Sequence, residues 1–282
     1  MDIKKIGVVG SGIMGSGIAQ TCAQSGYQVV MSDISEEAVN KGLNSILSSL
    51  KRSFEKGKIS KQYMDDSYGR ITGTTNMDDF ADCDLVIEAV PEVLEVKKKV
   101  FAQLDDILPE HAIMASNTSV LSVTDIAAAT KRPEKVLGMH FSNPVPVMRI
   151  IEIIRTLATS EETIEAARSF GESLGKKIVL VKDAPGFIAN RILTPFLLNA
   201  VRMLESGDIS CEEIDTLFTE GLGHPMGPLK LLDHIGIDTV LYGASAIYDE
   251  LKDPQYNPPI LMKKMVRLGW LGRKTGKGFY EY

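Results

Sequence analysis

The chain has 282 residues, of which 44% are hydrophobic and 24% are charged, and its formal net charge is −6 at pH 7. This length exceeds a single typical domain, so we expect a large domain with a smaller second one. The acidic balance offers no basic footprint for nucleic acid and no apolar run approaches membrane-spanning length, so we expect a cytoplasmic protein with neither nucleic acid nor membrane as partner.

The first third of the chain alternates short apolar runs with longer amphipathic stretches. Strands are predicted over 6–9 and 27–33, with a helix that starts at about Met14 between them. This order of strand, helix and strand predicts a parallel pair. A polar stretch over 51–70 follows, and we interpret it as an exposed helical excursion.

Five further buried strands are predicted along the middle of the chain, at 84–90, 112–116, 136–141, 149–154 and 177–181. Helical segments separate several of them. This alternation predicts a Rossmann-type α/β fold: a doubly wound, largely parallel sheet with helices on both faces and ligands at the carboxyl ends of its strands. The strands at 136–141 and 149–154 have no helix between them, so we expect an antiparallel, hairpin-like pair there.

The chain changes character after Asp183, where Ala184-Pro185-Gly186 interrupts it. The remainder has long helical periodicity without a convincing β run. We therefore predict an α/β domain over 1–183 and an all-helical domain over 184–282. The last eleven residues, GRKTGKGFYEY, are rich in glycine and charge, and we expect them to form a tail that crosses the surface.

A glycine loop, Gly10-Ser11-Gly12-Ile13-Met14-Gly15, follows the first strand and opens a helix, as dinucleotide binding requires. The first glycine permits a tight turn, the second lets the backbone approach a pyrophosphate, and the third lets the helix pack on the strand. The amino terminus of the helix offers N–H groups and a positive dipole to the phosphates. Asp33 ends the second strand, where a carboxylate accepts from a ribose 2′-hydroxyl and repels the 2′-phosphate of NADP, so the predicted cofactor is NAD.

Two residues in the middle of the chain are candidates for acid–base chemistry. His140 lies at the end of a predicted strand, where this fold opens its cleft, and imidazole exchanges protons near neutral pH. Glu152 lies among isoleucines, where an unpaired carboxylate would be costly. A Glu–His pair that fixes the imidazole tautomer is one solution, and an ordinary salt bridge to a lysine or arginine is the other. The sequence leaves both alternatives open for Glu152, and it also leaves open that His140 is purely structural.

The chain as a whole resembles the L-3-hydroxyacyl-CoA dehydrogenase family, and within it the short bacterial members that act on 3-hydroxybutyryl-CoA. Besides the glycine loop, the resemblance is carried in order by SNTS at 116–119, GMHF and NPVP within 138–146, APGF through NR at 184–191, and GRKTG through GFY at 272–280. It implies an NAD-dependent enzyme that interconverts (S)-3-hydroxyacyl-CoA and 3-oxoacyl-CoA. It also implies a cleft between the nucleotide domain and a helical domain that mediates formation of a homodimer.

The resemblance also assigns roles to single residues. It implies that His140 is the general acid/base, that Glu152 orients it, and that Ser119 and Asn190 contact the C3 oxygen of the substrate. Further cofactor contacts are implied for Glu92, Lys97, Ser119, Asn143 and Lys274, and coenzyme A contacts for Ser49, Lys56 and Ser119, beside the basic residues Lys51, Arg52 and Lys58. Without the family, Ser119 and Asn190 would pass as helix-start residues and the lysines as solvated surface. Ser142 departs from the phenylalanine that the family usually has after GMHF.

Two other functions share parts of this pattern. A β-hydroxyacid or 6-phosphogluconate-type dehydrogenase has a similar glycine loop but relies on a catalytic lysine, and a crystallin-like protein binds NAD without catalysis. The presence of His140 and Glu152 argues against the first, and the further presence of Ser119 and Asn190 argues against the second. No metal is expected, because the three cysteines and four histidines show no metal-ligand spacing.

Overall fold

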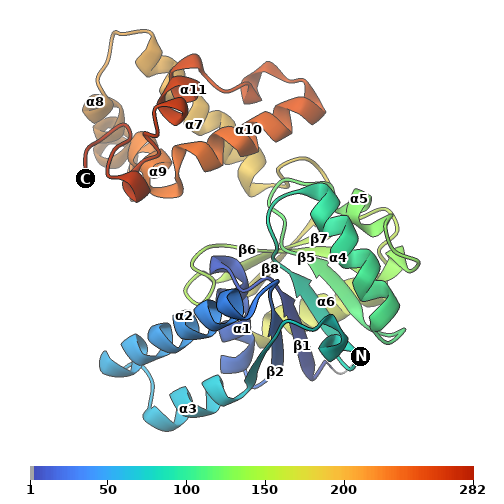
Figure 1. Cartoon of the computed structure of the whole chain (residues 1–282). Coiled ribbons are helices and arrows are strands. Elements are labelled where there is room, and N and C mark those ends of the chain that lie inside the picture. Colours follow the sequence, from blue (N-terminus) through green and yellow to red (C-terminus); the bar gives the residue numbers. More distant parts are fainter. Residues whose placement is uncertain (1–2) are drawn as a thin grey trace. The chain divides into compact units, whose positions relative to one another are not determined.

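The computed structural model describes residues 3–282, and these form two compact units (Figure 1). The first unit runs to Thr118 and resumes over Ser122–Asp183, and the second comprises Ser119–Leu121 and Ala184–Tyr282. Each unit is described by itself below.

The first unit is built on one eight-stranded sheet in the order β3-β2-β1-β4-β5-β6-β7-β8. The strands are β1 (Lys5–Val9), β2 (Gln28–Ser32), β3 (Ile71–Thr74), β4 (Leu85–Glu88), β5 (Ile113–Ser116), β6 (Val136–Phe141), β7 (Ile150–Arg155) and β8 (Lys177–Lys182). Neighbours from β3 to β6 are parallel, β7 is antiparallel to β6, and β8 is parallel to β7. The predicted Rossmann-type sheet and its antiparallel pair are therefore confirmed. The strand order reverses between β1 and β4, which is where this fold binds ligands.

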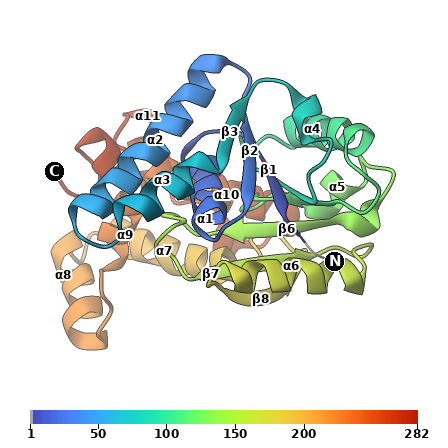
Figure 2. The same ribbon diagram turned by 90° about the horizontal axis from the view of Figure 1, so that it is seen from below.

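Helices cover both faces of this sheet. They are α1 (Ile13–Gln24), α2 (Glu36–Glu55), α3 (Lys61–Gly69), α4 (Leu94–Ile107), α5 (Val123–Ala127) and α6 (Glu161–Ser173), with short 3₁₀ turns at Met77–Phe80 and Pro133–Lys135. In Figure 2, α1, α2 and α3 lie on one side of the first strands and α4 and α5 on the other. The helices α2, α3, α5 and α6 begin at a serine whose hydroxyl accepts from a first-turn N–H, which satisfies an otherwise unpaired donor.

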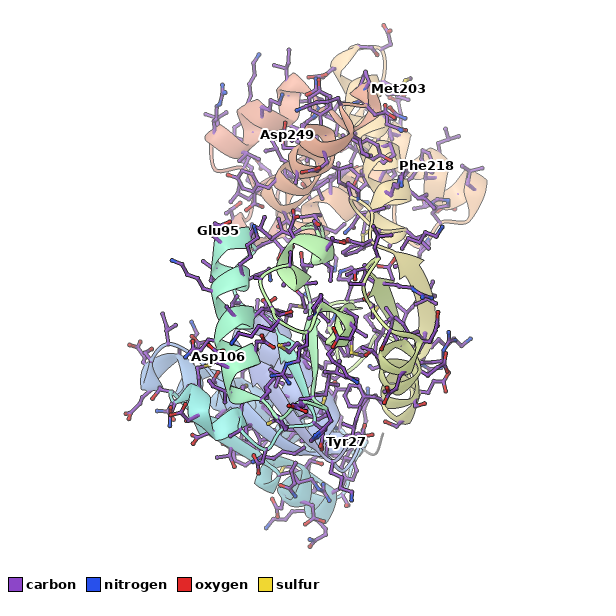
Figure 3. The ribbon with its side chains drawn as sticks, turned by 90° about the vertical axis from the view of Figure 1, so that its right-hand side faces the viewer. Tyr27, Glu95, Asp106, Met203, Phe218 and Asp249 are labelled. Atoms are coloured by element: carbon purple, nitrogen blue, oxygen red, sulfur yellow. The ribbon has the colours of Figure 1, made fainter. Side chains whose placement is uncertain are left out.

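Helix α4 shows how the amphipathic pattern places these helices. Its residues Phe101 and Leu104 are fully buried, whereas Glu95 and Asp106 lie on its exposed side (Figure 3). Removing the apolar stripe from water stabilises the helix on the sheet by roughly 1.5–3 kcal/mol for each large side chain.

The polar stretch over 51–70 is largely helical, as predicted: it comprises the end of α2, a turn over 56–60 and all of α3. The strand after it, β3, was not predicted from the sequence. It has four residues, ITGT, and lies at the edge of the sheet, where it pairs with a neighbour on one side only. An edge strand of this kind can form with few apolar residues, so its sequence carries a weak signal. Its Gly73 faces α2, where a Cβ would lie 2.5 Å from Val39 Cγ1, so the missing side chain is what lets the helix approach.

The second unit is helical, as predicted. It contains α7 (Ala189–Glu205), α8 (Cys211–Thr216), a π-helical turn (Leu217–Gly221), α9 (Pro228–Ile235), α10 (Ile237–Leu251), α11 (Ile260–Arg267) and 3₁₀ turns at Pro254–Tyr256 and Arg273–Thr275. Its core is a cluster of buried leucine, isoleucine, valine and methionine side chains from these helices.

The C-terminal tail is tied to the second unit by two buried carboxylates. Asp233 accepts hydrogen bonds from the backbone N–H groups of Phe279 and Tyr280, both at 2.9 Å, and from the Tyr282 hydroxyl at 3.1 Å. Asp215 accepts from the Tyr280 hydroxyl at 2.8 Å. The tail therefore follows the surface of this unit in one arrangement, because its backbone donors are satisfied by buried acceptors.

Candidate cofactor and catalytic site

The three loop glycines are used in three different ways. Gly10 has φ +100°, and a Cβ there would lie 2.6 Å from the Ala89 carbonyl oxygen. A Cβ on Gly15 would overlap the Gly10 carbonyl oxygen, so only glycine lets α1 start this close to β1. A Cβ on Gly12, by contrast, would meet nothing within 4 Å. The turn is therefore tight on the protein side and open on the other, as a backbone that accepts a close ligand needs to be.

The amino terminus of α1 adds the electrostatics that an anion requires. Gly12 occupies the N-cap position without a side-chain cap, and the first turn of the helix has no acidic residue. Backbone N–H groups and the positive end of the helix dipole thus point to the open side of the turn. These residues fit the pyrophosphate of a dinucleotide.

Asp33 lies directly after β2 and contacts the same turn. Its Oδ2 accepts from the Ser11 N–H at 2.7 Å and from the Ser11 hydroxyl at 2.8 Å, and its Oδ1 accepts from the Ile34 N–H at 2.8 Å. Partial burial opposes ionisation, but these hydrogen bonds outweigh it and hold the pKa of Asp33 below its usual value. Asp33 is therefore an anion that also anchors the glycine turn, a second role that the motif did not indicate.

His140 and Glu152 form a pair. They are cross-strand neighbours in the register of β6 and β7, so both side chains lie on the same face of the sheet. The distance from His140 Nδ1 to Glu152 Oε2 is 2.8 Å, and the two side chains are 14% and 8% exposed. Of the alternatives that the sequence left open for Glu152, the structure contains the Glu–His pair. A carboxylate on Nδ1 favours the tautomer that carries its proton there.

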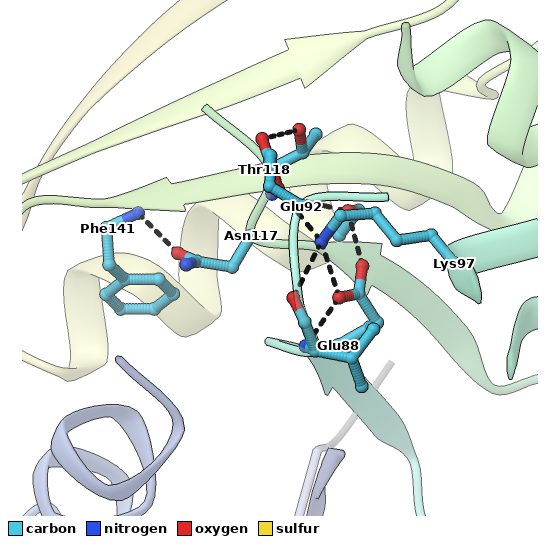
Figure 4. A network of polar contacts seen from close by, with 8 residues as sticks. Glu88, Glu92, Lys97, Asn117, Thr118 and Phe141 are labelled. Atoms are coloured by element: carbon cyan, nitrogen blue, oxygen red, sulfur yellow. Dashed lines mark hydrogen bonds and ion pairs between the residues drawn. The ribbon is translucent and has the colours of Figure 1, made fainter. Parts of the chain in front are cut away.

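A second polar network lies where β4 and β5 end (Figure 4). Lys97 is 1% exposed and contacts Glu88 at 2.7 Å and Glu92 at 3.2 Å. The alternative interpretation of Lys97, as a solvated surface lysine, is therefore wrong. Sequence reasoning missed Glu88, although a charged residue at the end of the apolar run LVIE is the same signal that drew attention to Glu152.

Asn143 lies exposed in the loop between β6 and β7, over 142–149, next to Ser142, which is half-buried. Lys176 fixes the same loop, because its ammonium donates hydrogen bonds to the carbonyl oxygens of Val145 and Met148, both at 2.7 Å. Val145 is buried against α1, where a Cβ on Gly17 would lie 3.0 Å from Val145 Cβ. The loop after the histidine strand is thus packed against the helix that starts at the glycine turn.

The remaining predicted residues lie in two groups. In the second unit, the Asn190 side chain donates to the Ser119 carbonyl oxygen at 3.3 Å, so these two residues are neighbours, and Lys274 forms an ion pair with Asp238 at 2.6 Å. In the first unit, Ser49 is half-buried on α2 and Lys56 is exposed at its C-cap, within the exposed basic run 51–58.

The described part of the chain, residues 3–282, holds no group of three or more His, Cys, Asp or Glu side chains placed to bind a metal ion. Over the same residues, no helix is both long enough and apolar enough to cross a bilayer.

Comparison with known proteins agrees with this geometry. Residues 5–184 match the family model of the 3-hydroxyacyl-CoA dehydrogenase NAD binding domain, and residues 186–282 match that of the 3-hydroxyacyl-CoA dehydrogenase C-terminal domain. The probable 3-hydroxybutyryl-CoA dehydrogenase of Bacillus subtilis is 46% identical, over 100% of this chain and 98% of the relative. The 3-hydroxybutyryl-CoA dehydrogenase of Mycobacterium tuberculosis is 44% identical over 99% of each chain.

Solved structures give the same result. The crystal structure of (S)-3-hydroxybutyryl-CoA dehydrogenase PaaH1 from Ralstonia eutropha has a TM-score of 0.96 and 47% sequence identity, and covers 100% of this chain and 99% of that one. Two family models that together span nearly the whole chain, with relatives similar over their full length, leave one conclusion. The chain belongs to the 3-hydroxyacyl-CoA dehydrogenase family of NAD-dependent enzymes, and its first unit is the NAD-binding domain of that family.

Proposed function

We propose that the protein interconverts (S)-3-hydroxybutyryl-CoA and acetoacetyl-CoA by moving a hydride between the C3 carbon and NAD. The observation that carries this proposal is the His140–Glu152 pair, 2.8 Å apart, on the strands that follow the cofactor-binding half of the sheet. The names of the relatives at 44–46% identity support the four-carbon substrate.

His140 performs the proton transfer in this proposal. Glu152 accepts a hydrogen bond from Nδ1–H, so Nε2 is the ring atom that takes the proton of the C3 hydroxyl during oxidation and returns it during reduction. The carboxylate stabilises the imidazolium that forms on proton uptake. Bound NAD supplies the hydride acceptor at its nicotinamide ring, or the hydride donor in its reduced form.

Ser119 and Asn190 hold the C3 oxygen in this proposal. A hydroxyl and a side-chain amide are both hydrogen-bond donors, and negative charge develops on that oxygen during reduction of the ketone. The hydrogen bond from the Asn190 side chain to the Ser119 backbone, at 3.3 Å, keeps the two donors together.

The other assignments concern binding. We assign the glycine turn, Asp33, Glu92, Asn143 and Lys274 to NAD, with the anionic Asp33 selecting it over NADP. Coenzyme A phosphates are assigned to the basic run 51–58 with Ser49, where Lys56 is exposed at the end of α2. Attraction between exposed opposite charges of this kind is weakened by salt.

We assign the helical unit over 184–282 to substrate binding and to a homodimer interface. Support comes from apolar side chains that are at least 60% exposed on this unit: Ile192, Leu217, Leu222, Tyr242, Ile260 and Leu268. Exposed apolar side chains support an interface where they adjoin one another, because large apolar patches are typical of interaction sites. Sedimentation velocity tests this assignment, and a monomer at micromolar concentration would contradict it.

Absorbance at 340 nm with NADH and acetoacetyl-CoA tests the chemistry. We expect turnover by the native protein, and a fall of roughly 10²–10⁴-fold in His140→Gln with unchanged NADH binding, because acid–base catalysis contributes about that factor. Binding of NADH without turnover by the native protein would favour a non-catalytic protein. Oxidation of a simple β-hydroxyacid with NAD, without turnover of the thioester, would favour the other dehydrogenase class.

A further inference from the structure

A buried carboxylate outside the recognised motifs lies at the end of β4. Glu88 is 0% exposed. Its Oε1 accepts from the Val90 N–H and from the Lys97 ammonium, both at 2.7 Å, and its Oε2 accepts from the Ser116 hydroxyl at 2.6 Å (Figure 4). These partners belong to the loop after β4, to helix α4 and to the adjacent strand β5. Glu88 therefore joins three segments at the carboxyl edge of the sheet.

The Lys97 ammonium has three donors, and each has an oxygen partner within the first unit. Besides Glu88 Oε1, it contacts the Val90 carbonyl oxygen at 3.3 Å and Glu92 Oε2 at 3.2 Å. Its side chain is only 2% exposed. The ammonium is thus directed into the protein, where it acts on its neighbours.

Glu92 is the member of this network that reaches the surface, with 38% of its side chain exposed. Its Oε1 accepts from the Thr118 hydroxyl at 2.5 Å, so both of its oxygens are held. The loop that carries it borders the glycine turn, because a Cβ on Gly10 would lie 2.6 Å from the Ala89 carbonyl oxygen. The network therefore presents one fixed carboxylate on a loop that borders the cofactor turn.

Stability alone does not account for a buried ion pair at this place. Taking two charges out of water offsets their attraction, and apolar side chains of similar size often stabilise a fold equally well. The Glu88–Lys97 pair does something that an apolar pair cannot do. Glu88 holds the Lys97 ammonium in a position from which it contacts a second carboxylate, that of Glu92.

We infer that Glu88 is a positioning residue for cofactor binding: it holds the Lys97 ammonium, which fixes the Glu92 carboxylate on the loop bordering the glycine turn for hydrogen bonding to bound NAD. The inference rests on the cofactor part of the proposed function, and the thioester chemistry is not needed for it. In this inference Lys97 acts on Glu92.

The test is a double-mutant cycle read out by NADH fluorescence titration, which requires no thioester. The pair is neutralised together in Glu88→Gln/Lys97→Met, so that no uncompensated charge stays buried, and the target is removed in Glu92→Ala. The matched control is Glu95→Gln/Lys98→Met, which makes the same changes in an exposed pair on the same helix, with side chains 75% and 32% exposed.

We expect Glu92→Ala to raise the Kd for NADH by roughly 10- to 100-fold, as the loss of a hydrogen bond to a charged group does. The pair variant is expected to raise it by roughly tenfold, and the control is expected to leave it unchanged. Combining the pair variant with Glu92→Ala should add nothing further, because the pair acts through Glu92. Thermal melting of each variant separates loss of binding from loss of the fold.

A native Kd in the folded pair variant, or effects that multiply when it is combined with Glu92→Ala, would overturn the inference. If the pair variant does not fold, Ser116→Ala removes the hydroxyl on Glu88 without changing any charge, and the same non-additivity with Glu92→Ala is required. A native protein that binds NADH but does not turn over acetoacetyl-CoA would refute the proposed chemistry and leave this cycle as a valid test.

Discussion

Replacing Glu152 by glutamine tests the pair on which the proposed chemistry depends. The substitution keeps the shape of a side chain that is 8% exposed and removes its charge, 2.8 Å from His140 Nδ1. A hydrogen bond to a charged group contributes about 1.5–3 kcal/mol. Since about 1.4 kcal/mol is a factor of ten, the lost stabilisation of the imidazolium lowers kcat by roughly 10- to 150-fold.

A second effect acts in the same direction. The side-chain amide that Glu152→Gln introduces can donate to Nδ1, which favours the tautomer with its proton on Nε2, and that atom can then no longer accept the hydroxyl proton. If this tautomer dominates, the loss approaches the whole acid–base contribution of roughly 10²–10⁴-fold. Cofactor affinity should stay native, because Glu152 is not among the residues that form the glycine turn.

The assay is steady-state turnover at 340 nm with NADH and acetoacetyl-CoA across pH, together with a fluorescence titration of NADH. The matched control is Glu161→Gln, which removes an exposed carboxylate paired with Arg155, with side chains 70% and 38% exposed. Exposed pairs contribute about 0–1 kcal/mol, so the control should be as active as the native protein. A native kcat and an unchanged pH–rate profile in Glu152→Gln would refute the orienting role.

Three further outcomes are expected. Asp33→Asn should lower the preference for NAD over NADP. Because the folded protein lowers the pKa of Asp33, the ionised carboxylate stabilises the fold at a pH above the ordinary value of 3.8, and this stabilisation is lost as the pH falls below that value. The melting temperatures of the native and variant proteins should therefore converge in acid. Lys176→Met leaves the Val145 and Met148 carbonyl oxygens without their donor, so it should lower the free energy of unfolding in urea by about 1–3 kcal/mol and raise the KM for NADH. Lys176→Arg should recover part of both losses. A native urea midpoint in Lys176→Met would contradict the role of Lys176 in holding this loop. Burial raises the pKa of Cys22 to about 12, so thiol-specific reagents should label it at pH 8 only after unfolding, and rapid labelling of the folded protein would disprove its burial.

Most of the sheet could be predicted because apolar, β-branched runs bounded by helical stretches are a local signal. The run over 136–141 and the run over 149–154 are examples, and the absence of a helix between them indicated their antiparallel pairing, which the structure has. The strand Ile71–Thr74 was missed for a physical reason. An edge strand is paired along one side only, so a short segment with one large apolar residue can fill the position, and its propensity does not stand out.

The candidate site divides in the same way. The glycine turn is contiguous in sequence, so its residue types and spacing were sufficient to locate it and to name a dinucleotide as ligand. Glu152 was noticed because a carboxylate in an apolar run needs a partner, yet that partner could not be named. Glu88 carried the same signal but was not noticed, and its partners Lys97 and Ser116, which lie on two other elements, could not have been named either.

The amino-acid sequence by itself determined the class of fold, the position of the cofactor turn and the residue types available for proton transfer, because each depends on neighbours along the chain. Only the tertiary structure decided which charged groups are paired. The register of β6 and β7 places Glu152 opposite His140, and the packing of α4 on the sheet buries Lys97 between Glu88 and Glu92. Charges act over a few ångströms of space whatever their separation in the chain, so their partners are known only once the strands and helices are in place.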